Sequence, residues 1–378
     1  MQLLSDPQLV GSGTPQQGAF RELNPADFLS REEVTLDTDQ ISGYLTGKTV
    51  LVTGGGGSIG SELCRQVMRF KPGKLLIFDI YENCAYELLM ELQQKYGRDI
   101  PVTVLIGSIR DKKRLDEVFE TYHPTVVFHA AAHKHVPLME VSPAEAVKNN
   151  VLGTKNLLVS ASEHDVERFV QLSTDKAVNP TSVMGCTKRI CEMLIQTFAG
   201  NTDMKCVAVR FGNVLGSHGS VIPLFEAQIK KGGPVTLTDP NIERYFMTIP
   251  EAAQLVLQAG ALAESGNIYV LDMGEPVKIM DLAKQLIRFY GYEPGVNMEI
   301  KIVGLRPGEK LYEELMMDEE QDKMRRTQHN KIFVASPRSI DLAEFYGQLQ
   351  ELAAAAEHND EGAVSYTHLR AHETGAYL

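Results

Sequence analysis

Hydrophobic and polar positions alternate regularly between residues 48 and 211. Short apolar runs rich in Val, Ile and Leu predict buried strands at residues 49–53, 74–79, 101–106, 125–130, 168–173 and 205–211. Between them, apolar residues recur at helical spacing, which predicts helices at residues 58–70, 81–96, 110–122, 143–163 and 184–199. Strands that alternate with helices form right-handed βαβ units. We therefore expect an α/β fold, a doubly wound parallel sheet with helices on both faces.

The pattern is less regular outside this region. After residue 212 it predicts strands at 235–238, 267–271, 298–303 and 331–335, and helices at 221–230, 250–263, 279–290 and 341–355. We expect a smaller C-terminal lobe, interleaved with the last strands of the sheet. Residues 1–36 are rich in Pro, Gly, Gln and Asp and predict an arm or linker. The next ten residues predict a short helix with Ile41, Tyr44 and Leu45 on one face.

The first strand ends in a cluster of glycines, and a helix is predicted to follow it. Gly54, Gly57 and Gly60 have the spacing Thr-Gly-x-x-Gly-x-x-Gly, which differs from G-x-G-x-x-G. The first N–H groups of a helix have no partner within the helix, and the helix dipole favours negative charge at that end. The pyrophosphate of a dinucleotide is the usual ligand of such a turn, and Ser58 and Ile59 belong to the same stretch.

Other strand ends carry residues that suit a dinucleotide. Asp79 closes the second strand, 25 residues after Gly54. A carboxylate there accepts hydrogen bonds from the adenosine ribose and repels a 2′-phosphate, so it favours NAD over NADP. The alternative role for Asp79 is to cap the helix that begins near residue 81. The third and fourth strands end in residues that we expect against adenine and beneath the cofactor: Ser108, Ile109, Ala130, Ala131 and Ala132.

Composition excludes several other classes of protein. The 378 residues include 37 basic and 49 acidic residues, a net charge of −12, with no long basic run, which argues against a nucleic-acid binder. No apolar stretch approaches the roughly 18 to 20 residues of a membrane span, and no signal peptide is evident. The five cysteines form no C-x-x-C pair, so a reducing cytoplasm is expected. His133 and His135 lack carboxylate partners, and we predict no metal site.

The fifth strand ends at Thr174, Asp175 and Lys176. The carboxyl ends of parallel strands line the ligand crevice of an open sheet, so an acid and a base side by side are notable there. The alternative is an exposed ion pair of little energetic value. Met184 and Lys188 are four residues apart and share one face of the next helix. Taken alone, they are a core methionine and a solvated lysine.

These motifs together resemble extended short-chain dehydrogenases/reductases. More closely they resemble the CapD-like nucleotide-sugar 4,6-dehydratases of bacterial polysaccharide synthesis, which act on UDP-N-acetylglucosamine. The matching stretches are residues 53–60, 129–140, 149–150, 173–177, 210–214, 219–223, 244–247 and 305–310. Met184 stands where the superfamily has a tyrosine, as in one branch of these dehydratases. In that position it cannot serve as an acid or a base.

The resemblance implies the organisation of the whole chain. It implies an arm at 1–46, an NAD-binding Rossmann domain at 47–212, a substrate-binding lobe at 213–335 and a C-terminal helix at 336–364. The tail at 365–378 is expected to be disordered or non-native. The resemblance also implies a homo-oligomer. Larger members of the group carry membrane helices ahead of this domain, so we expect either a cytoplasmic protein or the cytoplasmic part of a membrane-anchored one.

The implied reaction is a loss of water from the sugar through bound NAD. Lys176, with a pKa lowered by burial, would remove the C5 proton, and protonated Asp175 would donate to the departing C6 hydroxyl. Thr174 would bind the C4 oxygen and Lys188 the nicotinamide ribose. The acceptor of the C4 hydroxyl proton stays open between Asp175, Lys188 through the ribose, and a water in place of the phenol. The methionine branch leans toward retention of configuration at C5.

The resemblance assigns further contacts residue by residue. Asn150 is expected near the cofactor. The expected contacts of the UDP-sugar are Lys134, Asn213, Val221, Pro223, Thr238, Arg244, Arg306 and Glu309. Arginines suit the diphosphate because a guanidinium binds phosphate oxygens with two donors. Two alternatives remain for the chain as a whole: a 4-epimerase or reductase on the same fold, and a non-catalytic sensor of dinucleotides. An epimerase relies on a tyrosine acid/base, and a sensor usually loses the polar groups of the crevice.

Overall fold

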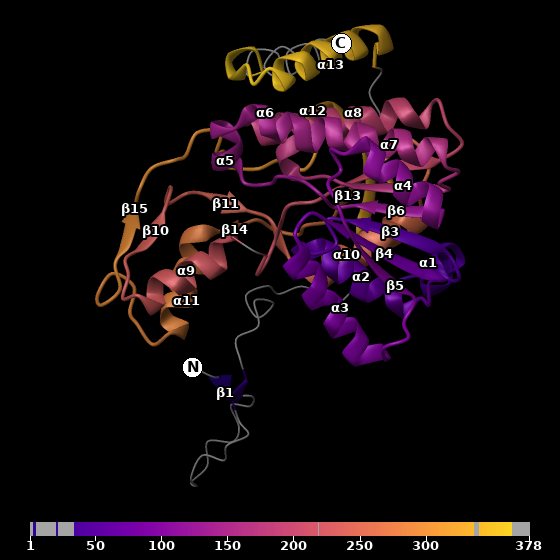
Figure 1. Ribbon diagram of the computed structural model, residues 1–378. Helices are drawn as coiled ribbons and strands as arrows, with labels where there is room; N and C mark the ends of the chain where they lie inside the picture. Colours follow the sequence, from indigo (N-terminus) through magenta and orange to yellow (C-terminus); the bar gives the residue numbers. More distant parts are fainter. Residues whose placement is uncertain (1–2, 5–19, 22–33, 218, 336–339, 365–378) are drawn as a thin grey trace.

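The computed structural model describes residues 3–4, 20–21, 34–217, 219–335 and 340–364 (Figure 1). Near the N-terminus, β1 (Leu3–Leu4) pairs antiparallel with β2 (Phe20–Arg21). The expectation of a linker concerns mainly residues 5–19 and 22–33, which lie outside the described residues. The same is true of the expectation for the tail at 365–378.

A nine-stranded sheet forms the centre of the described chain. In spatial order its strands are β16 (Arg325–Arg326), β17 (Ile332–Ala335), β13 (Ile268–Leu271), β8 (Lys205–Arg210), β7 (Arg168–Leu172), β6 (Val126–His129), β3 (Thr49–Thr53), β4 (Lys74–Asp79) and β5 (Val102–Ile106). All neighbours from β13 to β5 are parallel. The strands β17 and β16 add an antiparallel edge. The predicted doubly wound sheet is therefore confirmed, with its switch point between β3 and β6.

Helices cover both faces of this sheet (Figure 1). One layer contains α1 (Thr38–Leu45), α2 (Ser58–Arg69), α3 (Glu82–Tyr96) and α10 (Ile249–Ala261). The other contains α4 (Lys112–Tyr122), α7 (Gly153–Glu163), α8 (Val183–Ala199) and α13 (Leu342–Glu357). Along β3, Val50 and Val52 belong to the first core and Leu51 to the second. This alternation follows from the two-residue period of a strand, and both faces are apolar because both are covered.

Two parts of the helical prediction were incomplete. The helix predicted at 143–163 is divided into α6 (Pro143–Ala146), a π-helical turn (Val147–Leu152) and α7. The preceding α5 (Val136–Val141) was not predicted. It is short, and of its apolar residues Leu138 and Val141 are exposed while Met139 is buried, so six residues give no clear helical period. The five-residue α12 (Asp318–Asp322) was missed as well.

The smaller lobe has a hydrophobic core of its own. It contains α9 (Val221–Lys230), α11 (Ile279–Phe289), the parallel pair β10 (Val235–Leu237) and β15 (Ile300–Ile302), and the antiparallel pair β11 (Glu243–Arg244) and β14 (Val277–Lys278). A parallel pair, β9 (Asn213–Val214) and β12 (Phe246–Met247), leads into it. Figure 1 shows this lobe beside the edge of the large sheet. Within the described residues, no helix combines the length and apolar character that crossing a bilayer requires.

Candidate functional site

A pocket of about 600 Å³ lies at the carboxyl ends of β3, β4, β5 and β6, which is the switch point of the sheet. Its volume falls within the range of small-molecule and cofactor sites. The lining includes most of the predicted cofactor residues: Gly54, Gly57, Asp79, Ser108, Ile109, Ala130, Ala131 and Ala132. It does not include Ser58, Ile59, Gly60 or Asn150. The structure thus brings the ends of four strands together around one cavity.

The glycine turn needs its glycines for reasons of space. Gly54 has a φ of +67°, and a Cβ on it would stand 2.6 Å from the backbone nitrogen of Ala131. A Cβ on Gly60 would collide with the carbonyl oxygen of Gly54. Gly57 begins α2 and supplies no side-chain cap to the helix. The turn therefore approaches the neighbouring strand closely and leaves the start of α2 without bulk, as a pyrophosphate site requires.

Asp79 fixes the glycine turn and the residue that precedes α3. One carboxylate oxygen accepts from the backbone N–H of Tyr81, 2.9 Å away, just before α3. The other accepts from the N–H of Gly56 at 2.8 Å. Asp79 thus does not cap an N–H group within α3, whose N-terminus has no side-chain cap. Its carboxylate stays in the pocket lining, where a ribose can reach it.

Asn150 and Lys188 lie behind the pocket, in the packed interior. Asn150 is buried, and its amide accepts from the N–H of His133 and donates to the carbonyl oxygen of His133 and to the hydroxyl of Thr187. Lys188 is buried as well, so it is not a solvated lysine. Its ammonium donates to the carbonyl oxygen of Leu172 at 2.9 Å. Burial lowers the pKa of Lys188, and Cys191 and Glu192 offset only part of this.

Met184 is 3% exposed and packs with Met139, Ala146 and Val183. The interpretation of Met184 as a core methionine is therefore confirmed. Its side chain joins α8 to α5 and α6. It keeps the first turn of α8 apolar at the point where the superfamily pattern has a phenol.

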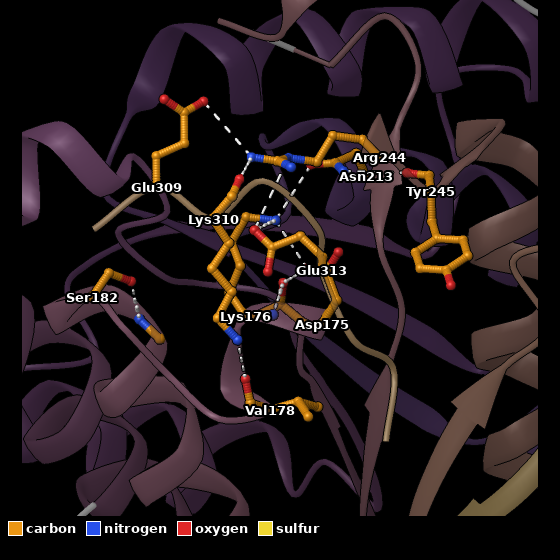
Figure 2. A network of polar contacts seen from close by, with 12 residues as sticks. Asp175, Lys176, Val178, Ser182, Asn213, Arg244, Tyr245, Glu309, Lys310 and Glu313 are labelled. Atoms are coloured by element: carbon orange, nitrogen blue, oxygen red, sulfur yellow. Dashed lines mark hydrogen bonds and ion pairs between the residues drawn. The ribbon is translucent and has the colours of Figure 1, made fainter. Parts of the chain in front are cut away.

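Thr174, Asp175 and Lys176 follow β7 directly and form the start of a charged cluster (Figure 2). Asp175 is fully buried. Its Oδ1 accepts from the Thr174 hydroxyl at 2.8 Å and from the Lys176 ammonium at 2.9 Å. The alternative of an exposed ion pair is wrong, because both members lie inside the site. The other oxygen, Oδ2, is buried and has no hydrogen-bond partner among the described residues.

The expectation of a lowered pKa for Lys176 is also wrong. Burial alone would lower it, but the carboxylates of Asp175 and Glu313 more than offset burial, so the pKa of Lys176 lies above its ordinary value. The Lys176 ammonium is 3.8 Å from a Glu313 oxygen and donates to the Asn213 side-chain oxygen at 3.5 Å. Lys176 is therefore charged before substrate arrives, and its route to the neutral form has to run through its neighbours.

Glu313 is the site residue that the sequence did not reveal. It follows residues 305–310, but its side chain turns inward and is 4% exposed. Its Oε2 is buried without a hydrogen-bond partner in the described chain. Burial and the charge of Asp175 raise the pKa of Glu313, partly offset by Lys176, Arg244 and Lys310. The only sequence signal is that apolar residues, among them Leu311 and Leu315, lie on both sides of it.

Arg244 holds the segment that carries Glu313. Its guanidinium donates to the carbonyl oxygens of Glu243, Lys310 and Leu311 at 2.7 to 3.1 Å. It lies 3.7 Å from Glu309 and 4.0 Å from Glu313 (Figure 2). Most of the N–H donors of Arg244 are thus occupied. A contact with a diphosphate would therefore require some of these hydrogen bonds to carbonyl oxygens to break.

The other expected substrate contacts lie around this segment. Arg306 is exposed, and its backbone N–H donates to Glu309. The other Glu309 oxygen accepts from the Thr238 hydroxyl at 3.2 Å. Val221 and Pro223 occupy the first turn of α9, and Lys134 is exposed between β6 and α5. The expected contacts thus come from both the lobe and the large sheet.

Among the described residues one group could offer metal ligands, Asp116, Glu163 and His164. It lies on α4 and α7, and the Lys112 ammonium already donates to both carboxylates, at 2.6 and 3.0 Å. This is an ordinary surface ion pair.

The fold and site define the chain as a dinucleotide-binding protein of the short-chain dehydrogenase/reductase type, with a charged cluster after strand β7 of its sheet. It belongs to the family described as polysaccharide biosynthesis protein, whose model matches residues 50–337. It is 56% identical to the capsular polysaccharide biosynthesis protein CapD of Staphylococcus aureus, over 81% of this chain and 51% of that protein. The chain thus spans about half the length of that relative.

Other relatives divide between two activities. The UDP-N-acetylglucosamine 4,6-dehydratase (inverting) of Campylobacter jejuni is 34% identical over 70% of this chain and 76% of that protein. The UDP-glucose 4-epimerase of Rickettsia canadensis is 36% identical over 73% of this chain and 80% of that protein. A solved UDP-glucose 4-epimerase from Thermus thermophilus, in complex with NAD, has a TM-score of 0.60 at 24% identity, covering 69% and 88% of the two chains. That likeness concerns the fold.

Proposed function

We propose that the chain is an NAD-dependent nucleotide-sugar 4,6-dehydratase that acts on UDP-N-acetylglucosamine in the synthesis of surface polysaccharide. The observation that carries this is the cluster of half-buried Thr174 and Lys176 around fully buried Asp175, after a strand of the sheet that also forms the dinucleotide pocket. Similarity to a 4,6-dehydratase supports it. Bound NAD would take a hydride from C4 of the sugar and return it to C6, and the C4 hydroxyl proton would pass to Asp175, to Lys188 through the ribose, or to a water.

The acid and base of the reaction would arise within one hydrogen bond. Lys176 donates to Asp175 Oδ1 at 2.9 Å. Transfer of that proton yields a neutral amine and a carboxylic acid, which are the base for C5 and the acid for the departing C6 hydroxyl. This route does not require Lys176 to be neutral beforehand. The Thr174 hydroxyl, bonded to the same oxygen of Asp175, would turn to the C4 oxygen.

The remaining contacts follow from the positions of the residues. Asp79 would accept from the adenosine ribose, and Lys188, which is buried and lies on α8, would reach the nicotinamide ribose. Arg306 is the exposed cation of its segment and would meet the diphosphate, with Glu309 and Thr238 beside the nucleoside.

A 4-epimerase is the second candidate, favoured by the epimerases among the relatives. The pair of Asp175 and Lys176 argues against it, because an epimerase removes no proton from C5 and expels no hydroxyl from C6, so it has little use for this acid and base.

One incubation separates these candidates. The protein is mixed with NAD⁺ and UDP-N-acetylglucosamine, and the product is analysed by mass spectrometry while the absorbance of NADH is followed. A dehydratase gives a product lighter by one water with no net NADH. An isomer of equal mass would establish the epimerase, and a nucleotide sugar that returns unchanged would support a sensor.

A further inference from the structure

The cluster around Lys176 contains one more carboxylate than the reaction needs. Lys176 lies between two acids, with Asp175 Oδ1 at 2.9 Å and Glu313 Oε1 at 3.8 Å. The Asp175 side chain is fully buried and that of Glu313 is 4% exposed. Each keeps one buried oxygen, Asp175 Oδ2 and Glu313 Oε2, without a hydrogen-bond partner in the described chain. Buried polar atoms of this kind are uncommon and call for an explanation.

The cations near Glu313 are directed elsewhere. Arg244 donates from its two NH₂ groups to backbone carbonyls, and its Nε is 4.0 Å from Glu313. The Lys310 ammonium donates to the carbonyl oxygen of Val178 and to Glu314. Lys176 forms its short contact with Asp175 and not with Glu313. A charged Glu313 would therefore be buried without a close donor, which is costly, whereas a protonated Glu313 would not.

We propose that Glu313 is a positioning residue of this reaction, which works as a neutral carboxylic acid and leaves Asp175 as the only anion that holds the proton on Lys176. This inference rests on the proposed function. An ionised Glu313 would stabilise the Lys176 ammonium from its second side and oppose transfer of the proton to Asp175. A neutral Glu313 does not hold the proton on Lys176. Glu313 therefore affects catalysis through Lys176, by making the transfer of that proton to Asp175 easier. The raised pKa of Glu313 agrees with this.

The sign of the pH effect follows from the groups that face Glu313, namely Asp175, Lys176, Arg244 and Lys310. As the pH rises through the raised pKa of Glu313, that residue becomes charged and the rate falls. Glu313→Gln keeps a neutral group of the same shape at every pH. At the pH optimum, the variant should keep kcat within about threefold of the native value. It should not show the fall in rate at higher pH that ionisation of Glu313 causes in the native protein.

The matched control is Glu314→Gln, which makes the same change one position along, on an exposed side chain. Its pH profile should coincide with that of the native protein. A Glu313→Gln profile that also coincides with the native one would show a purely structural role. A loss of kcat of a hundredfold or more, with thermal unfolding unchanged, would show that Glu313 works as an anion or transfers a proton itself. Either result overturns the proposal.

A second measurement does not depend on turnover. Carboxyl ¹³C NMR of the glutamate-labelled protein, with the Glu313→Gln spectrum used for assignment, should show Glu313 neutral near neutral pH. A Glu313 signal already ionised there overturns the proposal, even if the native protein forms no dehydrated sugar. Conversely, if Glu313 is neutral but the protein forms no such product, the result would contradict the proposed function and would still agree with the neutral state of Glu313.

Discussion

Two buried ionic clusters lie next to one another in this molecule, and they differ in how completely they are satisfied. In the first, Arg210 is fully buried and bonds Glu192 with two donors at 2.8 and 3.0 Å, Glu320 at 2.8 Å and the carbonyl oxygen of Leu315 at 3.0 Å. Glu192 also accepts from Ser173 and Arg189. In the second, around Lys176, two carboxylate oxygens have no partner among the described residues.

The same two segments supply both clusters. We call the satisfied cluster around Arg210 the closed cluster and the one around Lys176 the open cluster. Ser173 belongs to the closed cluster and Asp175, two residues further along the end of β7, to the open one. Glu320 belongs to the closed cluster and Glu313 to the open one, seven residues apart on the C-terminal segment. The closed cluster thus fixes the segments that present the open one. A buried network with all its hydrogen bonds made stabilises the chain segments that carry it. Polar atoms beside it that lack hydrogen bonds are available to a ligand.

The largest effect is expected at the open cluster. Lys176→Ala removes the group that exchanges the proton with Asp175, so the dehydration rate should fall by about 10²- to 10⁴-fold. Thermal unfolding should change little by comparison, since the cluster is not closed. Product formation and calorimetry measure the two. Lys112→Ala, at a surface ion pair, is the control. Dehydration at a rate near the native one would refute the assignment of Lys176.

At the closed cluster the expected effect is on folding. Arg210→Met leaves Glu192 and Glu320 buried without their cation, which should lower the free energy of unfolding by about 3–5 kcal/mol. Chemical denaturation measures this. Lys48→Met breaks the exposed pair with Glu167 and should cost less than about 1 kcal/mol. Equal losses of unfolding free energy in the two variants would mean that a buried ion pair contributes no more to stability here than an exposed one.

Acid should open the closed cluster. Burial would raise the pKa of Glu192, but Arg210, Arg189 and Ser173 lower it from 4.5 to about 2. A group whose pKa is lower in the folded state stabilises the fold above its unfolded pKa. Glu192 should therefore contribute about 3 kcal/mol near neutral pH, lost as the pH falls from about 4.5 toward 2. Denaturation curves across this range, compared with Glu192→Gln, test it. The same slope in both proteins would contradict it.

The smallest effect is expected where the two clusters meet. Ser173→Ala removes one hydrogen bond of 2.7 Å to Glu192, a contact with a charged acceptor worth about 1.5–3 kcal/mol. Stability should fall by that amount. The rate should fall severalfold, because Ser173 positions the residues that follow it. Thr197→Ala, which loses a buried bond to the carbonyl oxygen of Leu194 in α8, is the control. A loss of stability with an unchanged rate would show that Ser173 of the closed cluster does not position the residues of the open cluster.

The alternation of short apolar runs and amphipathic segments was sufficient to predict the parallel sheet and the helices around it. The glycine turn and Asp79 could be predicted because their signals are local: a strand, a turn and a helix within about thirty residues. The antiparallel edge formed by β17 and β16 was not predicted, since pairing direction is set by tertiary contacts. Nor was the π-helical turn, which depends on how α6, α7 and α8 pack around Asn150.

Glu313 and the Arg210 cluster could not have been found from local pattern. Glu313 belongs to no motif identified in the sequence, and its partners Asp175 and Lys176 are well over a hundred residues away. Only the folded chain brings the C-terminal segment against β7 through Arg244, Lys310 and Glu320. Sequence reasoning also mistook the protonation of Lys176, because it weighed burial and left out the charge of neighbouring carboxylates, Asp175 above all, which raises the pKa of Lys176.

The most direct measurement of the central claim is NMR of the product formed from UDP-N-acetylglucosamine and NAD⁺ in D₂O. The account predicts a UDP-linked 4-keto-6-deoxy sugar with deuterium at C5, since Lys176 exchanges its proton with solvent between removal from C5 and its return. Lys176→Ala should yield none of it. A product that keeps its C6 hydroxyl and is inverted at C4, or substrate that returns unchanged from protein shown to bind NAD, would contradict the account.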